Sequence, residues 1–518
     1  MVSSEIRVQT LNHLGIIAGL IDEIGLVEQI DQLVGKHPKE IVSAGQVVKA
    51  MILNGLGFVS APLYLFEQFF EGKATEHLIG SGVRPEHLND DRLGRVLDQL
   101  YMAGLTQLFV SIALKAAAQF GVATNTLHLD SSSFYVHGEY EPDAVALSVV
   151  VEKTASVDAE LRQEVAPKPI HITYGYSRDK RADLKQFIID LICTGDGDVP
   201  LYLRVADGNE ADKAVFAKLM QEFRQQFCVD GLMVADSALY TAPNLKLLQG
   251  LRWISRVPLT VAEAKRLVDE LDAQHFVATS VPGYRVVERQ SLYADVAQKW
   301  VIVESEARKQ ADMKQLLSSL DKLEQRLNQQ LLQLCTQDFR CEADALLAAE
   351  RFAKPLKYHC LVGVTVTKHS QHKKPGRPRQ DAQPQINYRL QATLERHQGA
   401  VQNALASSGR FVLATKVTDS AQLTAELVLL EYKRQQSPER GFRFLKDPLF
   451  FTNSVFVKSP ERVEALAKRL RRSFAFVMGL CLLVYSLGQR ARALLFGSGG
   501  RNSQKSVRSA YSASSSIY

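Results

Sequence analysis

One segment of this chain sets an acid among basic residues. It begins at Tyr432, ends at Lys446 and runs Y-K-R-Q-Q-S-P-E-R-G-F-R-F-L-K. Seven-residue steps separate Tyr432, Glu439 and Lys446, so a continuous helix would carry them on one face, unless Pro438 and Gly441 kink it. Two interpretations fit: a divalent metal on Glu439 beside a phosphate on Lys446, or a solvated helix with ion pairs.

Two aspartates elsewhere supply the carboxylates that a metal site would share with Glu439. Asp130 lies within one predicted strand, and Asp236 directly follows a later one. Ligands gather where the strands of mixed sheets end, although an aspartate there is also common as a turn cap. Mg²⁺ takes one or two carboxylates with waters and phosphate oxygens, and two such ions can activate an attacking oxygen and stabilise a leaving one.

The elements that must position these residues form several regions. Residues 1–122 are predicted to be an all-helical domain, because apolar residues recur there at three- and four-residue steps. Asn89 predicts the cap of a helix through Leu105. The stripe of the first helix consists of Leu11, Leu14, Ile17, Leu20 and Ile21.

Residues 123–258 and 410–496 are predicted to form an α/β core with a mixed sheet. A helix is expected over Glu210–Phe227. The expected strands are Thr126–His137, Pro169–Tyr176, Pro200–Val205, Gly231–Ala235, Arg252–Val257 and Arg410–Lys416.

A large insertion, residues 259–409, is predicted to separate the two parts of the core. It contains strand-like Tyr284–Tyr293 and Lys299–Glu304 and a long helix over 305–352 with near-heptad leucines. That helix could form a coiled coil, but packing on its own domain is favoured. The basic loop K-K-P-G-R-P-R contains Arg377 and Arg379 and suits either the A·T minor groove or a plain linker.

Charge is distributed unevenly, although the net charge is only +6. Residues 1–125 carry nine Lys/Arg against thirteen Asp/Glu, whereas residues 431–518 carry sixteen against five. A basic C-terminal portion suits a polyanion, or is simply a solvated face. The Gly/Ser-rich stretch 497–518 is predicted to be a disordered tail.

Cysteine and apolar patterns favour a cytoplasmic protein without a membrane partner. The six cysteines show no C-x-x-C spacing, which indicates reduced thiols instead of disulfides or a zinc site. The most apolar run, Ser473–Leu487, is shorter than the roughly 20 residues that span a bilayer, so we expect a buried helix. Trp253 and Trp300 are expected in the core, against the alternative that one holds a flipped base.

Several of these motifs together resemble a known family. The segment at Tyr432 resembles the signature Y-x2-R-x3-E-x6-K of bacterial insertion-sequence DDE transposases with an RNase H-like fold, the IS-four type, close to the IS-sixteen-thirty-four type. Gln435 stands at the Arg position of that signature, with Arg434 one residue earlier. Further likeness lies in L-H-L-D-S-S-S-F at Leu127, in Y-G-Y-S-R-D-K-R-A-D-L-K-Q, in P-L-Y-L-R-V-A-D-G-N-E-A-D and in V-A-D at Val234.

The resemblance implies a function and a set of site residues. Asp130, Asp236 and Glu439 would bind two Mg²⁺ or Mn²⁺ ions and be the catalytic carboxylates. The partner would be double-stranded DNA, both transposon terminal inverted repeats and target, with a homodimer in the synaptic complex. Cleavage at the ends and strand transfer would move the element by cut and paste. The residues expected at DNA are Tyr432, Arg434, Arg440, Arg443, Lys446, Arg377 and Arg379.

Two other functions remain compatible with the sequence. One is an RNase H-like nuclease without strand transfer. The other is an inactive, transposase-derived DNA-binding protein, to which the Gln435 substitution lends some support. The presence of all three carboxylates favours the enzyme.

Overall fold

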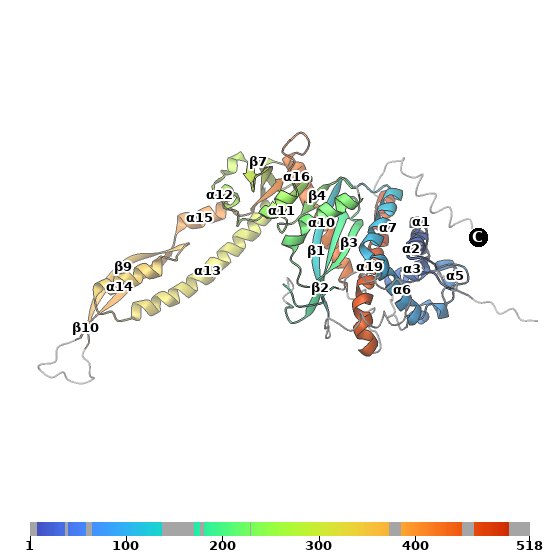
Figure 1. Cartoon of the computed structure of the whole chain (residues 1–518). Coiled ribbons are helices and arrows are strands. Elements are labelled where there is room, and N and C mark those ends of the chain that lie inside the picture. The colour runs from blue at the N-terminus through green and yellow to red at the C-terminus, as the bar shows by residue number, and fades with distance from the viewer. Residues whose placement is uncertain are drawn as a thin grey trace, which may run out of the picture.

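The computed structural model describes residues 8–36, 40–57, 65–136, 170–176, 181–227, 229–371, 385–447 and 460–496 (Figure 1). The N-terminal helices are α1 (Leu14–Ile24), α2 (Leu26–Val34), α3 (Ala44–Gly55), α4 (Phe66–Phe70), α5 (Thr75–Leu78), α6 (Asp90–Ala103) and α7 (Leu105–Gln119). As predicted, Asn89 caps α6, accepting a hydrogen bond from Arg92 N at 2.9 Å. The helix ends earlier than Leu105, because Gly104 has φ 85°.

Nine described strands form one sheet, in the order β3-β2-β1-β4-β5-β11-β8-β7-β6. Strands β1, β2 and β3 are antiparallel, β4 and β5 run parallel to β1, and β11 returns antiparallel between β5 and β8. The bounds are β1 (Thr126–Val136), β2 (Lys185–Thr194), β3 (Pro200–Ala206), β4 (Leu232–Ala235), β5 (Trp253–Val257), β6 (Val277–Ala278), β7 (Tyr284–Tyr293), β8 (Val296–Ser305) and β11 (Arg410–Thr415). The predicted α/β architecture with a mixed sheet and a helical N-terminal region is confirmed.

One predicted strand is wrong. The expected second strand, Pro169–Tyr176, makes only an isolated bridge between Thr173 and Gln186 in its described part. The true second strand is β2, whose residues are almost all buried between the layers. A strand covered on both faces loses its alternation of polar and apolar residues, so the run F-I-I-D-L-I-C gives no period-2 signal.

Helices cover both faces of this sheet. On one face lie α16 (Ala425–Lys433) and α17 (Gln436–Leu445). Three further helices alternate with the central strands along the chain: α10 (Asp212–Phe227) before β4, α11 (Ala242–Leu247) between β4 and β5, and α12 (Ala262–Glu270) after β5. Trp253 and Trp300 are fully buried, as predicted, and the Trp300 indole donates to the Tyr240 hydroxyl at 3.1 Å.

An arm projects far from the sheet (Figure 1). It consists of α13 (Glu306–Thr336), α14 (Glu342–Ala353), the ribbon β9 (His359–Gln371) with β10 (Gln385–Arg396), and α15 (Gln398–Ala406). The single helix expected over 305–352 is therefore wrong, because the chain reverses between α13 and α14. As favoured from the sequence, α13 packs on its own chain: Leu320, Leu327 and Leu331 are buried, and α13 lies along β10.

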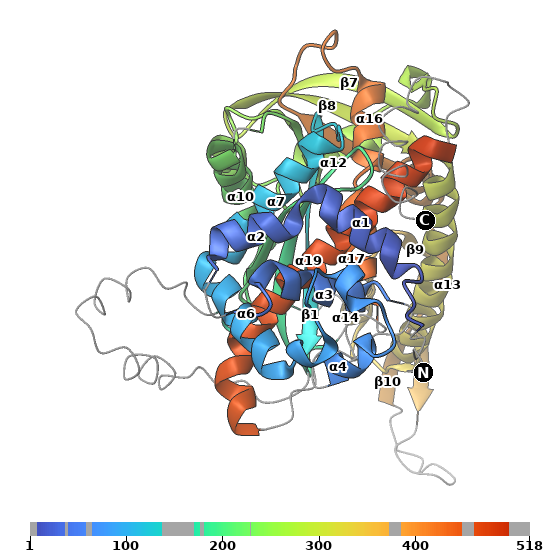
Figure 2. The same ribbon diagram turned by 90° about the vertical axis from the view of Figure 1, so that its right-hand side faces the viewer.

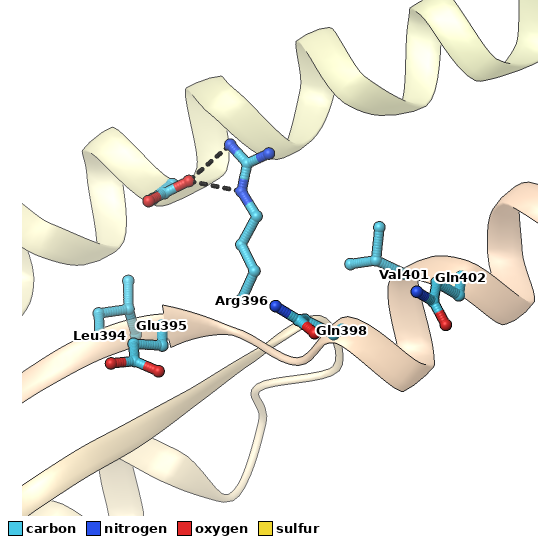
Figure 3. Close-up of a pocket in the computed structure, with 7 residues that line it drawn as sticks. Leu394, Glu395, Arg396, Gln398, Val401 and Gln402 are labelled. Atoms are coloured by element: carbon cyan, nitrogen blue, oxygen red, sulfur yellow. Dashed lines mark hydrogen bonds and ion pairs between the residues drawn. The ribbon is translucent and has the colours of Figure 1, made fainter.

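Ion pairs fix the ribbon to α13. Arg396, at the end of β10, meets Asp321 Oδ1 at 2.6 Å. It also meets Glu324 Oε2 at 2.6 Å (Figure 3). These contacts line a shallow cavity of about 500 Å³ together with Val401 and Gln402. Gln398 and Leu394 also border it.

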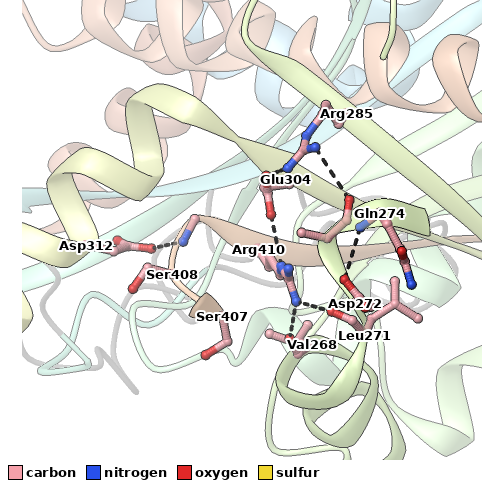
Figure 4. Close-up of polar contacts among 12 residues, drawn as sticks. Val268, Leu271, Asp272, Gln274, Arg285, Glu304, Asp312, Ser407, Ser408 and Arg410 are labelled. Carbon is pink, nitrogen blue, oxygen red and sulfur yellow. Dashed lines mark hydrogen bonds and ion pairs between the residues drawn. The ribbon is translucent and has the colours of Figure 1, made fainter. Parts of the chain in front are cut away.

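A buried arginine fixes the base of the arm. Arg410 reaches from β11 to Glu304 on β8 at 3.1 Å and to the carbonyls of Val268 and Leu271 at 3.1 and 2.7 Å (Figure 4). The pKa of Glu304 is lowered: burial acts to raise it, but hydrogen bonds from Arg285 and Arg410 outweigh that effect. The point where the arm leaves the sheet and the point where it returns are thereby held together.

The last described helix joins the N-terminal helices to the sheet. Figure 2 shows α19 (Pro460–Phe496) running behind the N-terminal helices. Its residues from Ala475 to Val484 are all buried, which confirms the buried helix expected there. Among the described residues, no single helix is long and apolar enough to cross a membrane. One bent pair of helices, α6 with α7, has the length and composition of a membrane span, and no other feature in the described part of the chain supports that role.

The packing of α2 on α3 gives a test of this fold. A Cβ on Gly45 of α3 would lie 2.7 Å from Val27 Cα, whereas a Cβ on Gly19 of α1 would meet nothing within 4 Å. Gly45→Ala should therefore cost about 1–3 kcal/mol of unfolding free energy, because backbone atoms cannot move aside. Gly19→Ala, the matched control, should add about 0.5–1 kcal/mol through helix propensity. Urea unfolding followed by circular dichroism measures both, and equal stabilisation by the two would contradict the packing.

Candidate active site

Strand register places the two aspartates side by side. Parallel pairing joins Leu129 of β1 to Ala235 of β4, and Asp130 and Asp236 are the next residues of the two strands. Neighbouring residues on paired strands point to the same face of a sheet, so both carboxylates lie on one face. The predicted proximity of these two residues follows from the backbone alone.

Local hydrogen bonds orient both carboxylates. Asp130 Oδ1 accepts from Ser131 N at 2.9 Å, and Asp236 Oδ1 accepts from Ala238 N at 2.8 Å. The second bond closes a turn at the end of β4, which is the ordinary role of aspartate after a strand. Both side chains remain half-buried, with access to solvent.

Tyr432 lies close to this pair from the covering helix α16. Burial raises the pKa of Tyr432 to about 12, and the charges of Asp236 and Asp130 act in the same direction. Its hydroxyl therefore remains protonated at neutral pH. It can donate a hydrogen bond beside the two aspartates.

The single helix expected through Tyr432, Glu439 and Lys446 is wrong. The chain breaks at Arg434–Gln435, so Tyr432 lies on α16 and Glu439 on α17. Pro438 causes the break: a proline fits the first turn of a helix but clashes with the carbonyl four residues earlier. Gly441 does not kink α17, and it instead allows close packing against Leu191 and Leu482.

Glu439 lies on the exposed face of α17. The buried face of α17 consists of Ser437, Pro438, Gly441, Phe442 and Leu445. Glu439 lies outside the arc of the helical wheel that these residues occupy, and it is exposed. Within the described ranges, no three His, Cys, Asp or Glu residues are placed so that they could hold a metal ion together. The pair Asp130 and Asp236 alone suits Mg²⁺, which needs one or two carboxylates besides water and phosphate oxygens.

The expected DNA-contacting residues of α16 and α17 are all exposed apart from half-buried Tyr432, yet several already have partners. Arg434 donates to Glu431 Oε1 at 2.7 Å. Lys446 lies over the Phe134 ring, 5.4 Å from its centre. Arg443 is exposed to solvent as well. Arg377 and Arg379 lie outside the described residues.

Arg440 holds α17 to the turn before β3. Arg440 donates from Nε to Asp198 Oδ2 at 2.6 Å and from Nη2 to Asp198 Oδ1 at 2.7 Å. The Ser437 hydroxyl also donates to Asp198. Burial acts to raise the pKa of Asp198, but these hydrogen bonds and the Arg440 charge outweigh it, so the pKa lies below its ordinary value. Arg440 thus positions the helix that carries Glu439.

A polar network beside the aspartates was missed from the sequence. Ser131 donates to Asp190 Oδ1 at 2.5 Å, Asp190 accepts from Arg204 Nε at 2.8 Å, and Arg204 also pairs with Glu210. The cavity next to it, about 810 Å³, is bordered by Asp236, Ser131 and Tyr176. The signal was the single acid inside the apolar run of β2, since a buried carboxylate requires a partner.

The comparisons with known proteins bear on this arrangement. The family model described as "Transposase DDE domain" matches residues 125–471, more than half of the 518-residue chain. The chain belongs to this family. It is therefore a DDE transposase, a protein of mobile elements that acts in transposition and DNA recombination. Residues 6–114 of the transposase match a "Domain of unknown function (DUF4277)".

No curated protein matches the transposase. Among solved structures it is similar to a piggyBac transposase in a synaptic complex with hairpin DNA, at 9% identity and a TM-score of 0.36. That likeness covers 98% of this chain and 80% of the other.

The clamp between Arg440 and Asp198 gives a pH-dependent prediction. Asp198→Asn should lower the unfolding free energy at pH 7 by about 1 kcal/mol, a modest value because Arg440 is half-exposed. A lowered carboxyl pKa stabilises the fold above the unfolded value of about 4, and this stability is lost as pH falls through the folded pKa. The difference between wild type and Asp198→Asn should therefore shrink below about pH 4.

Urea unfolding between pH 3 and 7 measures this difference. Asp183→Asn is the matched control, because Asp183 pairs with Arg181 at 2.9 Å on an exposed surface. A loss for Asp198→Asn that is no larger than the control, or that does not change with pH, would contradict the clamp.

Proposed function

We propose that this transposase cuts DNA at the terminal inverted repeats of an insertion sequence and transfers the freed 3′ ends to target DNA, by cut and paste. The observation that carries the proposal is the side-by-side placement of Asp130 and Asp236 within the matched transposase domain. An RNase H-like core is part of the proposal. Its support is the antiparallel order β3-β2-β1 followed by β4 and β5 parallel to β1.

We propose that Asp130 and Asp236 hold two Mg²⁺ or Mn²⁺ ions, and Glu439 is included as the third ligand on the strength of the motif. Such ions supply an activated attacking oxygen and a stabilised leaving oxygen when bound. The aspartates are pre-oriented for this by Ser131 N and Ala238 N. The protonated Tyr432 hydroxyl would donate to a phosphate oxygen, and Arg434, Arg440, Arg443 and Lys446 would hold the backbone nearby.

The insertion, residues 259–409, is proposed as a separate functional unit between the two parts of the core. Its first strands extend the main sheet, and in the sequence Arg377 and Arg379 lie between β9 and β10 of its arm. We further propose a homodimer on paired DNA ends and a cytoplasmic location.

Removing one carboxylate tests the proposed chemistry. With Mg²⁺ and a labelled duplex carrying the end of the encoding element, Asp130→Asn should slow strand cleavage at least about a hundredfold, because a metal ion supplies several kcal/mol. Binding of the same duplex in Ca²⁺ should remain. Asp295→Asn, which removes an exposed acid paired to Lys246, is the control and should cleave normally.

The same assay separates the alternative functions. Cleavage without joining of the labelled end to a plasmid would identify a nuclease, and binding without cleavage by the wild type would identify an inactive DNA-binding protein. Persistent cleavage by Asp130→Asn would overturn the metal assignment.

The basic loop gives a separate prediction. Changing Arg377 and Arg379 to Ala should weaken end binding and lower the dependence of log K on log salt by up to about 2, because each arginine that no longer binds a phosphate lowers the slope by about 1. Fluorescence anisotropy across a salt series measures the slope. Arg340→Ala with Arg351→Ala keeps the same charge change elsewhere on the arm, and an unchanged slope in the loop variant would refute DNA binding by the loop.

A further inference from the structure

An arginine continues the row that contains the two aspartates. Parallel pairing joins Ala235 of β4 to Ser255 of β5. The residues that follow these two, Asp236 and Arg256, are therefore neighbours across the sheet. On the far side, Arg256 pairs with Leu413 of β11, which is buried under α16. Asp130, Asp236 and Arg256 thus follow one another on three adjacent strands. Neither the signature nor the expected DNA contacts include Arg256.

A second arginine meets the first over one aromatic ring. The guanidinium carbon of Arg256 lies 5.5 Å from the centre of the Phe411 ring, and that of Arg308 lies 5.7 Å from it. Arg308 belongs to the first turn of α13, so the contact is made where the arm begins. Cation–π contact with the Phe411 ring attracts both guanidinium groups to one place.

The pair has too few counter-ions. Arg308 has one carboxylate neighbour, Asp312, at 3.4 Å. In the described part of the chain no carboxylate pairs with Arg256, although the side chain is half-buried. The pKa of Arg256 is lowered, because burial and the charge of Arg308 outweigh the opposite effects of Tyr432 and Asp312.

Even a half-buried guanidinium that no acid pairs with gains from the arrival of an anion. The Tyr432 hydroxyl lies within electrostatic range of Arg256, Arg308 and both aspartates, so an anion here would touch the same site. A guanidinium fork matches the two free oxygens of a phosphodiester, and two such forks suit one phosphate or two consecutive ones.

We propose that Arg256 and Arg308 form a phosphate-binding site for the DNA backbone next to Asp130 and Asp236. The proposal rests on the proposed function, because the phosphate belongs to the DNA strand being cut or joined. It also supplies an arginine contact in a chain where Gln435 stands at the Arg position of the signature. The alternative is a purely structural role in which Arg256 balances the charges of the aspartates.

The test pairs protein variants with altered DNA. Full-length wild type, Arg256→Gln, Arg256→Lys and Arg308→Gln are titrated in Ca²⁺ with a duplex carrying the element end. The same duplex is then used with a single neutral methylphosphonate at each backbone position around the cleavage point. Arg326→Gln, an exposed arginine of α13 without a partner among the described residues, is the matched control.

Arg256→Gln should weaken binding about tenfold and lower the salt slope by about 1, and Arg256→Lys should restore the slope but not the full affinity. One methylphosphonate should weaken wild-type binding about tenfold and leave Arg256→Gln unaffected. Thermal unfolding without DNA should be unchanged or slightly raised in Arg256→Gln, because an under-compensated cation is removed.

Three results would overturn the phosphate site while leaving the proposed function intact: an unchanged slope in Arg256→Gln, equal methylphosphonate losses in wild type and variant, or a loss of stability alone. If Arg256→Gln fails to fold, Arg308→Gln and the wild-type scan of modified duplexes decide the question. If the wild type itself neither binds nor cleaves the unmodified duplex, the proposed function fails instead.

Discussion

The parallel pairing of β1, β4 and β5 is the constraint on which the rest of this transposase depends. Backbone hydrogen bonds between these strands set a register in which Leu129, Ala235 and Ser255 are neighbours. A slip of one residue would turn Asp130 or Asp236 to the opposite face of the sheet, so the register cannot drift without losing the pair. Asp130, Asp236 and Arg256 take their places from this ladder, and side-chain contacts then refine them.

The long segment between β5 and β11 strains that arrangement less than its length suggests. β11 must fit between β5 and β8 although a long segment separates it from β5 along the chain, and closing such a loop costs entropy that grows slowly with its length. Arg410 and Glu304 offset this cost where the two ends of the arm meet, and Asp312 adds a bond from Gly409 N at 3.1 Å. The arm can therefore extend outward without disturbing the row of residues that begins at Asp130.

Sequence reasoning located the aspartates but not their full surroundings. Alternation in β1 was strong enough to place this strand within a few residues, and the signature led to Glu439. The second strand was missed because burial on both faces removes alternation. The sequence left open whether one helix carries both Tyr432 and Glu439, because residue spacing alone does not show whether a helix continues through Pro438. Arg256 carried no signal, since only the pairing of β4 with β5 brings it beside Asp236.

The position of α19 has a consequence for how the protein is made. This helix packs against α1, α3, α6 and α7 at one end of the chain and against α17 at the site, where the Phe444 and Tyr485 rings stack 4.8 Å apart. It comes after every other described element in the sequence, so during synthesis the N-terminal helices leave the ribosome long before it. At roughly 5–20 residues per second their apolar surface waits on the order of tens of seconds for its cover. A growing chain is thus incomplete at both the N-terminal helices and the site helix until α19 has emerged, and that interval is when chaperones would bind it.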